Sequence, residues 1–170
     1  MVQSETPILV LFWQEGGAHL PATMTSGSNC RAIAHQRLPR MEDEVAISNP
    51  IAGVGIPDSR MAREATQLVR DTASDLLFYH STRVYLWGVL VGKRKGLVFD
   101  PELLYVAAMF HDIGLTARYR ESRLRFEVDG ANAAREFLHD QGISEREIER
   151  VWAAVALHNT PGIPEHAPLE

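Results

Sequence analysis

The feature of this sequence that most restricts its fold is a series of helix boundaries between Pro57 and Pro161, with no strand pattern among them. Short polar side chains stand at the expected helix starts, where their oxygens accept hydrogen bonds from the first free backbone N–H groups. The boundaries predict five helices, at about residues 58–73, 74–92, 100–112, 129–140 and 144–158. We therefore expect an all-α helical bundle over residues 51–170 of this 170-residue chain, which is long enough to bury a core.

Three of these helix starts carry specific signals. Asp100 is followed by Pro101 at the first helical position and by an acidic residue in the first turn, which is the usual order at a helix N-terminus. Ser144 and Glu147 have the spacing of a capping box. Asp129 is expected to cap the fourth helix.

Residues 1–50 have a different pattern, with one strand-like run, Ile8 to Trp13, and then Gly- and Ser-containing segments without a helical period. We expect a poorly structured N-terminal extension. A short hairpin packed on the core and residues read from an upstream start codon are the alternatives. No Lys or Arg precedes the apolar run, so it is not expected to be a signal peptide.

Charge and composition exclude several classes of function. The 17 Lys and Arg residues against 22 Asp and Glu residues give a net charge of −5, so nucleic-acid binding is not expected. No apolar run reaches the roughly 20 residues of a membrane span. The single cysteine, Cys30, excludes a disulfide within the chain and a cysteine-based zinc site. We expect a cytoplasmic protein with a small-molecule substrate as partner, and a homo-oligomer is left open.

Three histidines, His80, His111 and His158, occupy the expected core-facing stripes of three different helices. One such histidine is usually a core residue with a satisfied hydrogen bond. Three that converge are costly to bury unless something binds them, and imidazole is a common metal ligand. The stripes are Leu76 or Leu77, His80, Val84, Trp87 and Val91; Leu104, Ala107, Ala108 and His111; and Ile148, Val151, Val155 and His158.

Asp112 follows His111 directly and lies about 100° further round the helix, so that both side chains can reach one ion. Its alternative role is that of a solvated acid at the helix end. A carboxylate is unfavourable at the negative end of a helix dipole, and a bound cation reverses that penalty. Gly114 supplies a stop shortly afterwards.

Four segments of the chain, taken together, resemble the HD superfamily of metal-dependent phosphohydrolases and are most similar to its cyanamide hydratase-like group. The resemblance implies an HD-type helical domain and makes His80, His111 and Asp112 ligands of one divalent metal ion. Zinc, iron and manganese all suit such ligands. The segments are Tyr79–Tyr85, Phe110–Thr116, Arg125–Ala131, and Val151 and Trp152 with Ala156, Leu157 and His158.

The family pattern also implies a fourth ligand, an Asp on a later helix. After His158 the acidic residues of this chain are Glu165 and Glu170, so the domain is expected to be truncated at its C-terminus. His158 and His166 are the alternatives for the missing ligand. We expect His158 to lie behind the ligands or to face the substrate, and His166 to belong to a solvated tail.

Other residues are candidates for catalysis or substrate binding. Glu127 is expected either to take part in catalysis, as a general acid or base or by holding a metal-bound water, or to pair with a nearby arginine. His158 is the second candidate for proton transfer. Arg83 stands one helical turn after His80 and is expected either to bind an anionic substrate or to pair with an acid on a neighbouring helix. A basic loop, which either steers an anionic substrate or is a solvated surface, contains Arg118, Arg120, Arg123 and Arg125.

The resemblance implies a metal-dependent hydrolase or hydratase that activates water on a divalent ion. The expected substrate is a small phosphate ester, or a nitrile as in the cyanamide hydratase type, which is a lyase. The alternative is a catalytically impaired HD-fold module that binds a ligand or regulates, because it lacks the fourth metal ligand. A third interpretation is a fragment that needs a partner chain to complete its core.

Overall fold

The structure is a computed structural model that describes residues 50–160. Residues 1–49 of the predicted N-terminal extension, including the run Ile8 to Trp13, lie outside the described part, and so does His166.

Five α-helices make up the described part of the chain, and two short 3₁₀ turns join the third of them to the fourth. No residue between 50 and 160 belongs to a strand, and residues 51 and 54 form one isolated bridge. The prediction of an all-α fold is confirmed. In this range, no helix combines the length and apolarity of a membrane span. The elements are α2 (Arg60–Thr72), α3 (Asp75–Lys95), α4 (Pro101–Phe110), η1 (Ile113–Leu115), η2 (Ala117–Tyr119), α5 (Phe126–Asp140) and α6 (Glu145–Ala156).

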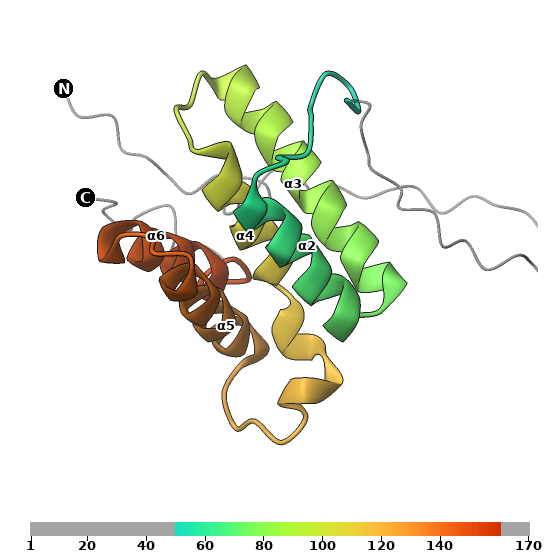
Figure 1. The fold of residues 1–170 in the computed structure, drawn as a ribbon, viewed down its shortest axis with the longest axis vertical. Helices are drawn as coiled ribbons and strands as arrows, with labels where there is room; N and C mark the ends of the chain where they lie inside the picture. The colour runs from blue at the N-terminus through green and yellow to red at the C-terminus, as the bar shows by residue number, and fades with distance from the viewer. Residues whose placement is uncertain (1–49, 161–170) are drawn as a thin grey trace, which may run out of the picture.

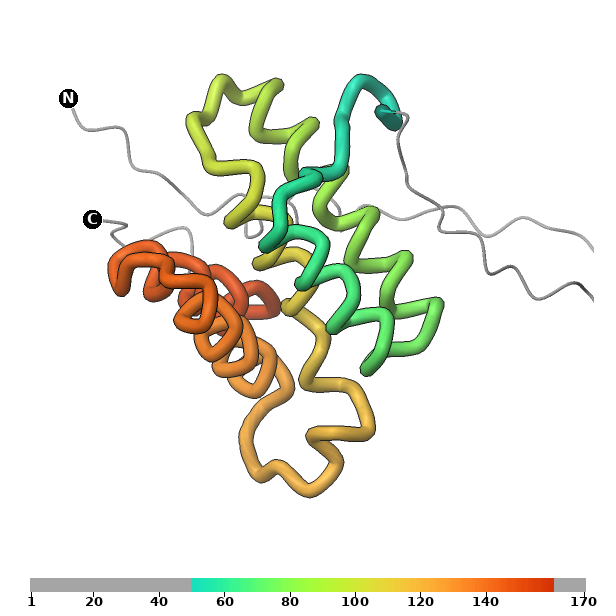
Figure 2. The backbone as a smooth tube through the Cα atoms, in the orientation of Figure 1, coloured from blue at the N-terminus to red at the C-terminus, as the bar shows by residue number. Residues whose placement is uncertain are grey.

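Helix α4 is the centre of the bundle. Each of its residues from Leu104 to Phe110 is buried, and it packs against α2 and α3 on one side and against α5 and α6 on the other (Figure 1). A helix that is apolar all round is buried all round, which is why this short segment occupies the middle. Helices α5 and α6 form an antiparallel pair, and the loop with η1 and η2 lies at one end of the molecule (Figure 2).

The predicted helix starts are confirmed for four of the five helices. Ser59 and Ser74 accept hydrogen bonds from the backbone N–H groups of Ala62 and Leu77. The Asp100 carboxylate accepts two, at 2.8 and 3.1 Å, from the first turn of α4. The Ser144 hydroxyl accepts a bond from the Glu147 backbone and donates one to its carboxylate at 2.6 Å.

The predicted start of the fourth helix at Asp129 is wrong, because α5 begins at Phe126. The backbone N–H groups of Val128 and Asp129 already bond to the Arg125 carbonyl, at 2.9 and 3.1 Å. Asp129 is therefore inside the first turn, buried, and accepts a hydrogen bond from the Ser122 hydroxyl at 2.9 Å. A short polar residue near a helix start also serves as a partner of the preceding loop, and spacing alone does not separate the two roles.

The predicted ends of three helices also shift. Helix α3 continues past Gly92 to Lys95, and Gly96 ends it in the left-handed conformation, with φ of 67°, which glycine adopts at little cost. Helices α4 and α6 end at Phe110 and Ala156, so His111 and His158 lie just beyond the last helical residues. Both remain within the buried region.

The predicted core stripe of α3 is partly wrong. Leu76 and Trp87 are 77% and 54% exposed, whereas Phe78, Tyr85 and Val89 are buried. Apolar residues occur on two faces of this helix, and its periodicity does not select between them. The contacts of α3 with α4 and α2 select the face that carries Phe78 and Tyr85.

Gly130 of α5 permits a close crossing with the end of α4. A Cβ atom at this position would stand 2.7 Å from the Phe110 carbonyl oxygen and 3.1 Å from that of His111. Gly114 plays a similar part, because a Cβ there would overlap the backbone of Phe126. These two glycines bring α5 against the backbone on either side of Asp112.

We predict that Gly130→Ala lowers the stability of the protein by about 1–3 kcal/mol, because the added methyl group meets backbone carbonyls that cannot move easily. The direction of this change in stability is informative, because replacing a glycine inside a helix by alanine otherwise stabilises the helix. The control is Gly55→Ala, where a Cβ would have no neighbour within 4 Å. Denaturant unfolding of both variants is the measurement, and an unchanged or higher stability of Gly130→Ala contradicts the close crossing of α5 and α4.

We also predict that the protein loses stability between about pH 10 and pH 12. Burial, with a further contribution from Tyr105, raises the pKa of Tyr85 from 10.0 to about 12. The folded state therefore holds this proton more tightly, so the stabilisation is complete below the unfolded pKa and is lost as the pH rises towards the folded one. Unfolding curves at pH 8, 10 and 11 measure the loss. Tyr85→Phe should reduce the loss of unfolding free energy per pH unit. If this variant loses stability as steeply as the wild type, other groups cause the loss.

Candidate metal site

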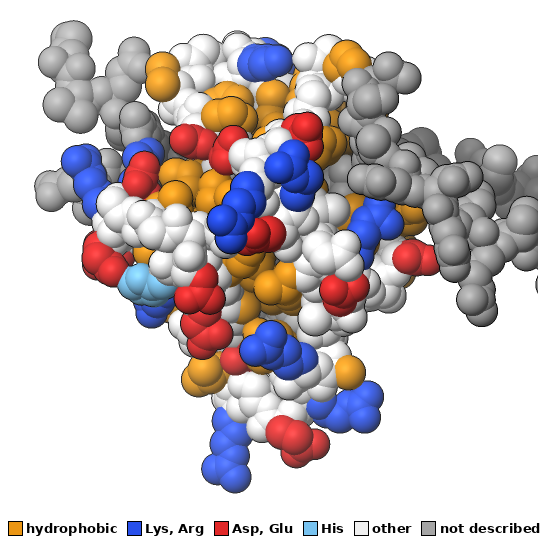
Figure 3. Space-filling model, viewed as in Figure 1, with side chains coloured by type: hydrophobic (Ala, Val, Ile, Leu, Met, Phe, Trp, Pro, Cys, Tyr) orange, Lys and Arg blue, Asp and Glu red, His pale blue; other side chains and the backbone are white. Residues whose placement is uncertain are grey.

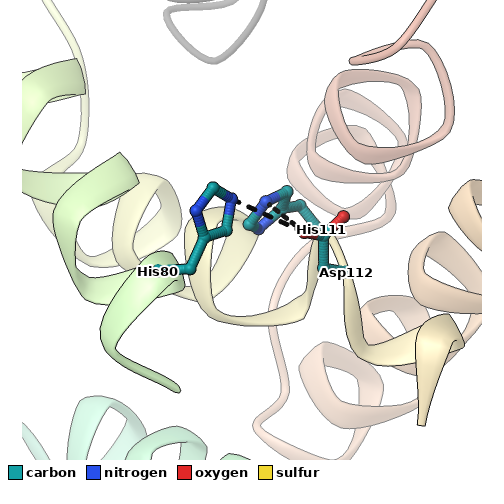
Figure 4. A group of neighbouring side chains, drawn as sticks. All are labelled: His80, His111 and Asp112. Atoms are coloured by element: carbon teal, nitrogen blue, oxygen red, sulfur yellow. Dashed lines mark ion pairs between the residues drawn. The ribbon is translucent and has the colours of Figure 1, made fainter. Parts of the chain in front are cut away.

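His80, His111 and Asp112 come together between α3 and the end of α4 (Figure 4). One nitrogen or oxygen atom from each lies within 4.8 Å of the others. The Asp112 Oδ2 atom is 3.2 Å from His111 Nε2 and 3.5 Å from His80 Nε2. The three residues singled out as ligands from the sequence are thus neighbours in space, although 31 positions separate His80 from His111 in the chain.

The orientation of His111 is fixed by the helix that carries it. Its Nδ1 atom lies 2.7 Å from the carbonyl oxygen of Ala108, and because a carbonyl only accepts, Nδ1 is the protonated nitrogen. The side chain is 1% exposed. In the neutral imidazole this leaves Nε2 as a lone-pair acceptor that points at Asp112.

Asp112 is ionised in this surrounding. Burial disfavours its charge, but His111 and His158, when protonated on Nε2, outweigh the burial through hydrogen bonds and ring charge, and they hold the pKa of Asp112 well below its ordinary value. The carboxylate is 15% exposed. An ionised carboxylate and an imidazole lone pair are both acceptors, so their contact is favourable only with a proton or a cation between them.

His80 closes the cluster from α3 and forms its open side. Its side chain is 39% exposed, against 1% for His111. Partial burial and the nearby charge of His111 lower the pKa of His80, and Arg83 adds to this, while Asp112 opposes it. A lowered pKa favours the neutral imidazole, which is the form that binds metal ions.

His158 reaches the other oxygen of the same carboxylate. Its Nε2 atom is 3.6 Å from Asp112 Oδ1, and its Nδ1 atom is 2.7 Å from the carbonyl oxygen of Val155. The buried ring packs between His111 and Phe126, with centroid separations of 5.1 and 5.9 Å. His158 is therefore beside the cluster of three ligands but is not one of its members.

Glu127 is buried at the start of α5 and pairs with Arg125. Two hydrogen bonds of 2.5 and 3.3 Å join the guanidinium to the carboxylate. Burial raises the pKa of Glu127, but the bonds and the charge of Arg125 outweigh it, with a small contribution from His158, so the pKa lies below its ordinary value. Of the two roles left open for Glu127, the arginine pair is present, and its part in catalysis stays a prediction.

Arg83 is exposed on α3, one turn after His80. The arginines of the predicted basic loop are exposed as well, and Lys and Arg side chains gather around the end of the molecule that carries this loop (Figure 3). One of them, Arg125, is held by Glu127, and another, Arg118, lies over the ring of Tyr119. The binding of an anionic substrate by Arg83 stays a prediction.

The sequence analysis did not single out Phe126 or Gly130 for the site. Phe126 packs its ring on His158, and Gly130 lets α5 approach the carbonyls of Phe110 and His111. Both belong to a segment that carries the family resemblance, Arg125–Ala131. The resemblance marks the segment, but only the packing of α5 against α4 shows what these two residues do.

The donor set fits a divalent cation. Two imidazole nitrogens and one carboxylate oxygen converge, and nitrogen and oxygen ligands of this kind suit zinc, iron and manganese. A cation would also remove the unfavourable contact between the Nε2 lone pair of His111 and the carboxylate of Asp112, because it accepts electrons from both. The residues present therefore fit the metal ion that the sequence predicts.

Two comparisons with known proteins bear on this cluster. An uncharacterized protein of Clostridium beijerinckii is 30% identical over 69 residues, which cover 41% of this chain and 43% of that protein. The chain thus covers less than half of that relative. The family model described as HD domain matches residues 77–169, more than half of the chain. This match does not extend to the cyanamide hydratase-like group. HD domains bind divalent metals and are typically metal-dependent hydrolases, and with its His/His/Asp cluster this chain belongs to the HD-domain family.

Proposed function

We propose that this protein is a metal-dependent hydrolase in which His80, His111 and Asp112 hold one divalent ion. The observation that carries the proposal is the contact of 3.2 Å between the Asp112 carboxylate and His111 Nε2. The Ala108 carbonyl holds the proton of His111 on Nδ1, so the nitrogen that faces the carboxylate is free to bind a cation. Family membership supports the same assignment.

When bound, a divalent ion at these ligands supplies Lewis acidity, which makes water a nucleophile near neutral pH and polarises the substrate. The protein residues prepare the site for this chemistry. His111 and Asp112 are held by the end of α4, His111 in one tautomer and Asp112 in its ionised form. His80 is the most exposed of the three ligands, so we expect substrate to approach from its side.

His158 is our candidate for proton transfer. Its Nε2 atom faces the ligand Asp112, whereas its Nδ1 atom is held by the Val155 carbonyl. The ring can therefore accept or return a proton only at Nε2, on the side of the site. Glu127, ionised and paired with Arg125, supports the charge of His158 when that ring is protonated.

A small phosphate ester is the substrate class that we favour. The exposed guanidinium of Arg83 stands one turn from His80, where it can bind phosphate oxygens in a bidentate manner. A neutral nitrile gains nothing from this charge, so hydration of a nitrile is the second candidate. The catalytically impaired binding module remains a distinguishable outcome of the experiments below.

We predict that the purified protein, grown with added metal salts, contains about one divalent ion per chain. His111→Ala and Asp112→Ala should each lose most of the metal, because two donors bind far more weakly than three. His139→Ala is the matched control, since His139 pairs with Glu145 at 3.3 Å on the surface. Elemental analysis by mass spectrometry is the measurement. A wild-type chain that takes up no zinc, iron or manganese on reconstitution would refute the proposed site.

We further predict that the metal-loaded protein hydrolyses small phosphate monoesters. Loss of a positioned acid or base lowers turnover by roughly 10²–10⁴-fold, so His158→Ala should reduce kcat by that order while metal content is retained. Arg83→Ala should raise KM for a phosphate ester and leave that for cyanamide unchanged. The assay uses a panel of phosphate esters and cyanamide. Full metal loading without turnover of either class would favour the binding module over the enzyme.

A further inference from the structure

Helix α3 carries an apolar stripe on the face opposite to the core. Leu76, Tyr79 and Trp87 are 77%, 53% and 54% exposed. With the exposed Arg83 and the half-buried Leu90 they follow spacings of three, four, four and three residues, which place all five on one helix face. A stripe of exposed tyrosine, tryptophan and leucine side chains is typical of a surface that binds another protein.

The order of residues in this stripe is symmetric about Arg83. Tyr79 and Trp87 stand four positions before and after it, and Leu76 and Leu90 stand seven positions before and after it. If two copies of α3 pack antiparallel with Arg83 at the crossing point, Tyr79 meets Trp87 of the other copy and Leu76 meets Leu90. A twofold axis uses the same patch on both copies, which requires this kind of self-complementarity.

The charges at the two ends of α3 complement each other in the same arrangement. Asp75 lies in the first turn, and Lys93, Arg94 and Lys95 form the last turn. Antiparallel pairing brings the acidic end of one helix to the basic end of the other, and it also opposes the two helix dipoles favourably. Parallel pairing would place like charges side by side.

We propose that two copies of this chain form a dimer through antiparallel packing of α3 about a twofold axis at Arg83. The two guanidinium groups do not collide, because helical side chains lean towards the N-terminus of their own helix. In antiparallel helices that direction is opposite for the two copies. Each Arg83 therefore leans towards His80 of its own chain. Burial and His111 are the larger causes of the lowered pKa of His80, and the charge of Arg83 also lowers it. The dimer thus leaves each Arg83 beside its own site.

Mass measurement by sedimentation or light scattering over a range of concentrations tests the dimer with the full chain. We expect a reversible dimer whose dissociation constant rises at least tenfold in Trp87→Glu and in Leu76→Glu. The matched control is Val98→Glu, which places the same charge on an apolar residue that is 87% exposed outside α3. Circular dichroism checks that each variant is folded. A wild-type monomer at all concentrations, or equal dissociation constants in Trp87→Glu and Val98→Glu, overturns the proposal.

Disulfide trapping tests the position of the axis without relying on a destabilising variant. In a Cys30→Ser background, Arg83→Cys should cross-link to its copy under mild oxidation, because only residues at the axis approach their own counterparts. Leu76→Cys should not cross-link to a second copy of the same variant. When it is mixed with Leu90→Cys, the two different variants should cross-link to each other. Self-cross-linking of Leu76→Cys would indicate a parallel pair and would overturn the antiparallel arrangement.

Discussion

The Asp112 carboxylate is the group on which the organisation of the site depends. It is ionised, mostly buried and surrounded by His80, His111 and His158 from three parts of the bundle. A buried charge is tolerated only where compensating groups reach it. The helices bring imidazole nitrogens to this charge, and a proton on a ring or a bound cation then balances it.

The bundle holds two of the rings by the same device. His111 and His158 both follow the last residues of a helix, and each hydrogen-bonds through Nδ1 to the carbonyl three residues earlier, at 2.7 Å. The bond at Nδ1 orients each ring, and His158 shares the Val155 carbonyl with its own backbone N–H group, at 3.4 Å. Gly130 then lets α5 close against this end of α4, which keeps the oriented rings within reach of one another.

Support for the function is stronger for the reaction class than for the substrate and the roles of single residues. Membership of the HD-domain family and the His/His/Asp cluster support a metal-dependent hydrolase at the coarse level. The substrate, the proton-transfer role of His158 and the anion-binding role of Arg83 are proposals that depend on the positions of these side chains. The proposed dimer follows from a different observation, the exposed face of α3. It shares Arg83 with the site, because this residue stands at the proposed twofold axis and one turn from His80.

The sequence by itself determined the all-α class and the starts of four helices, because capping and the spacing of residues along a helix are local properties. The resemblance to the HD superfamily supplied His80, His111 and Asp112 as the expected ligands. The sequence misplaced the start of α5, since whether Asp129 caps a helix or binds Ser122 depends on how the preceding loop folds. It also assigned Leu76 and Trp87 to the core side of α3, where both are exposed, whereas Tyr85 is buried. A helix with apolar residues on two faces has no intrinsic inside, and only its packing against α2 and α4 decides which face becomes core.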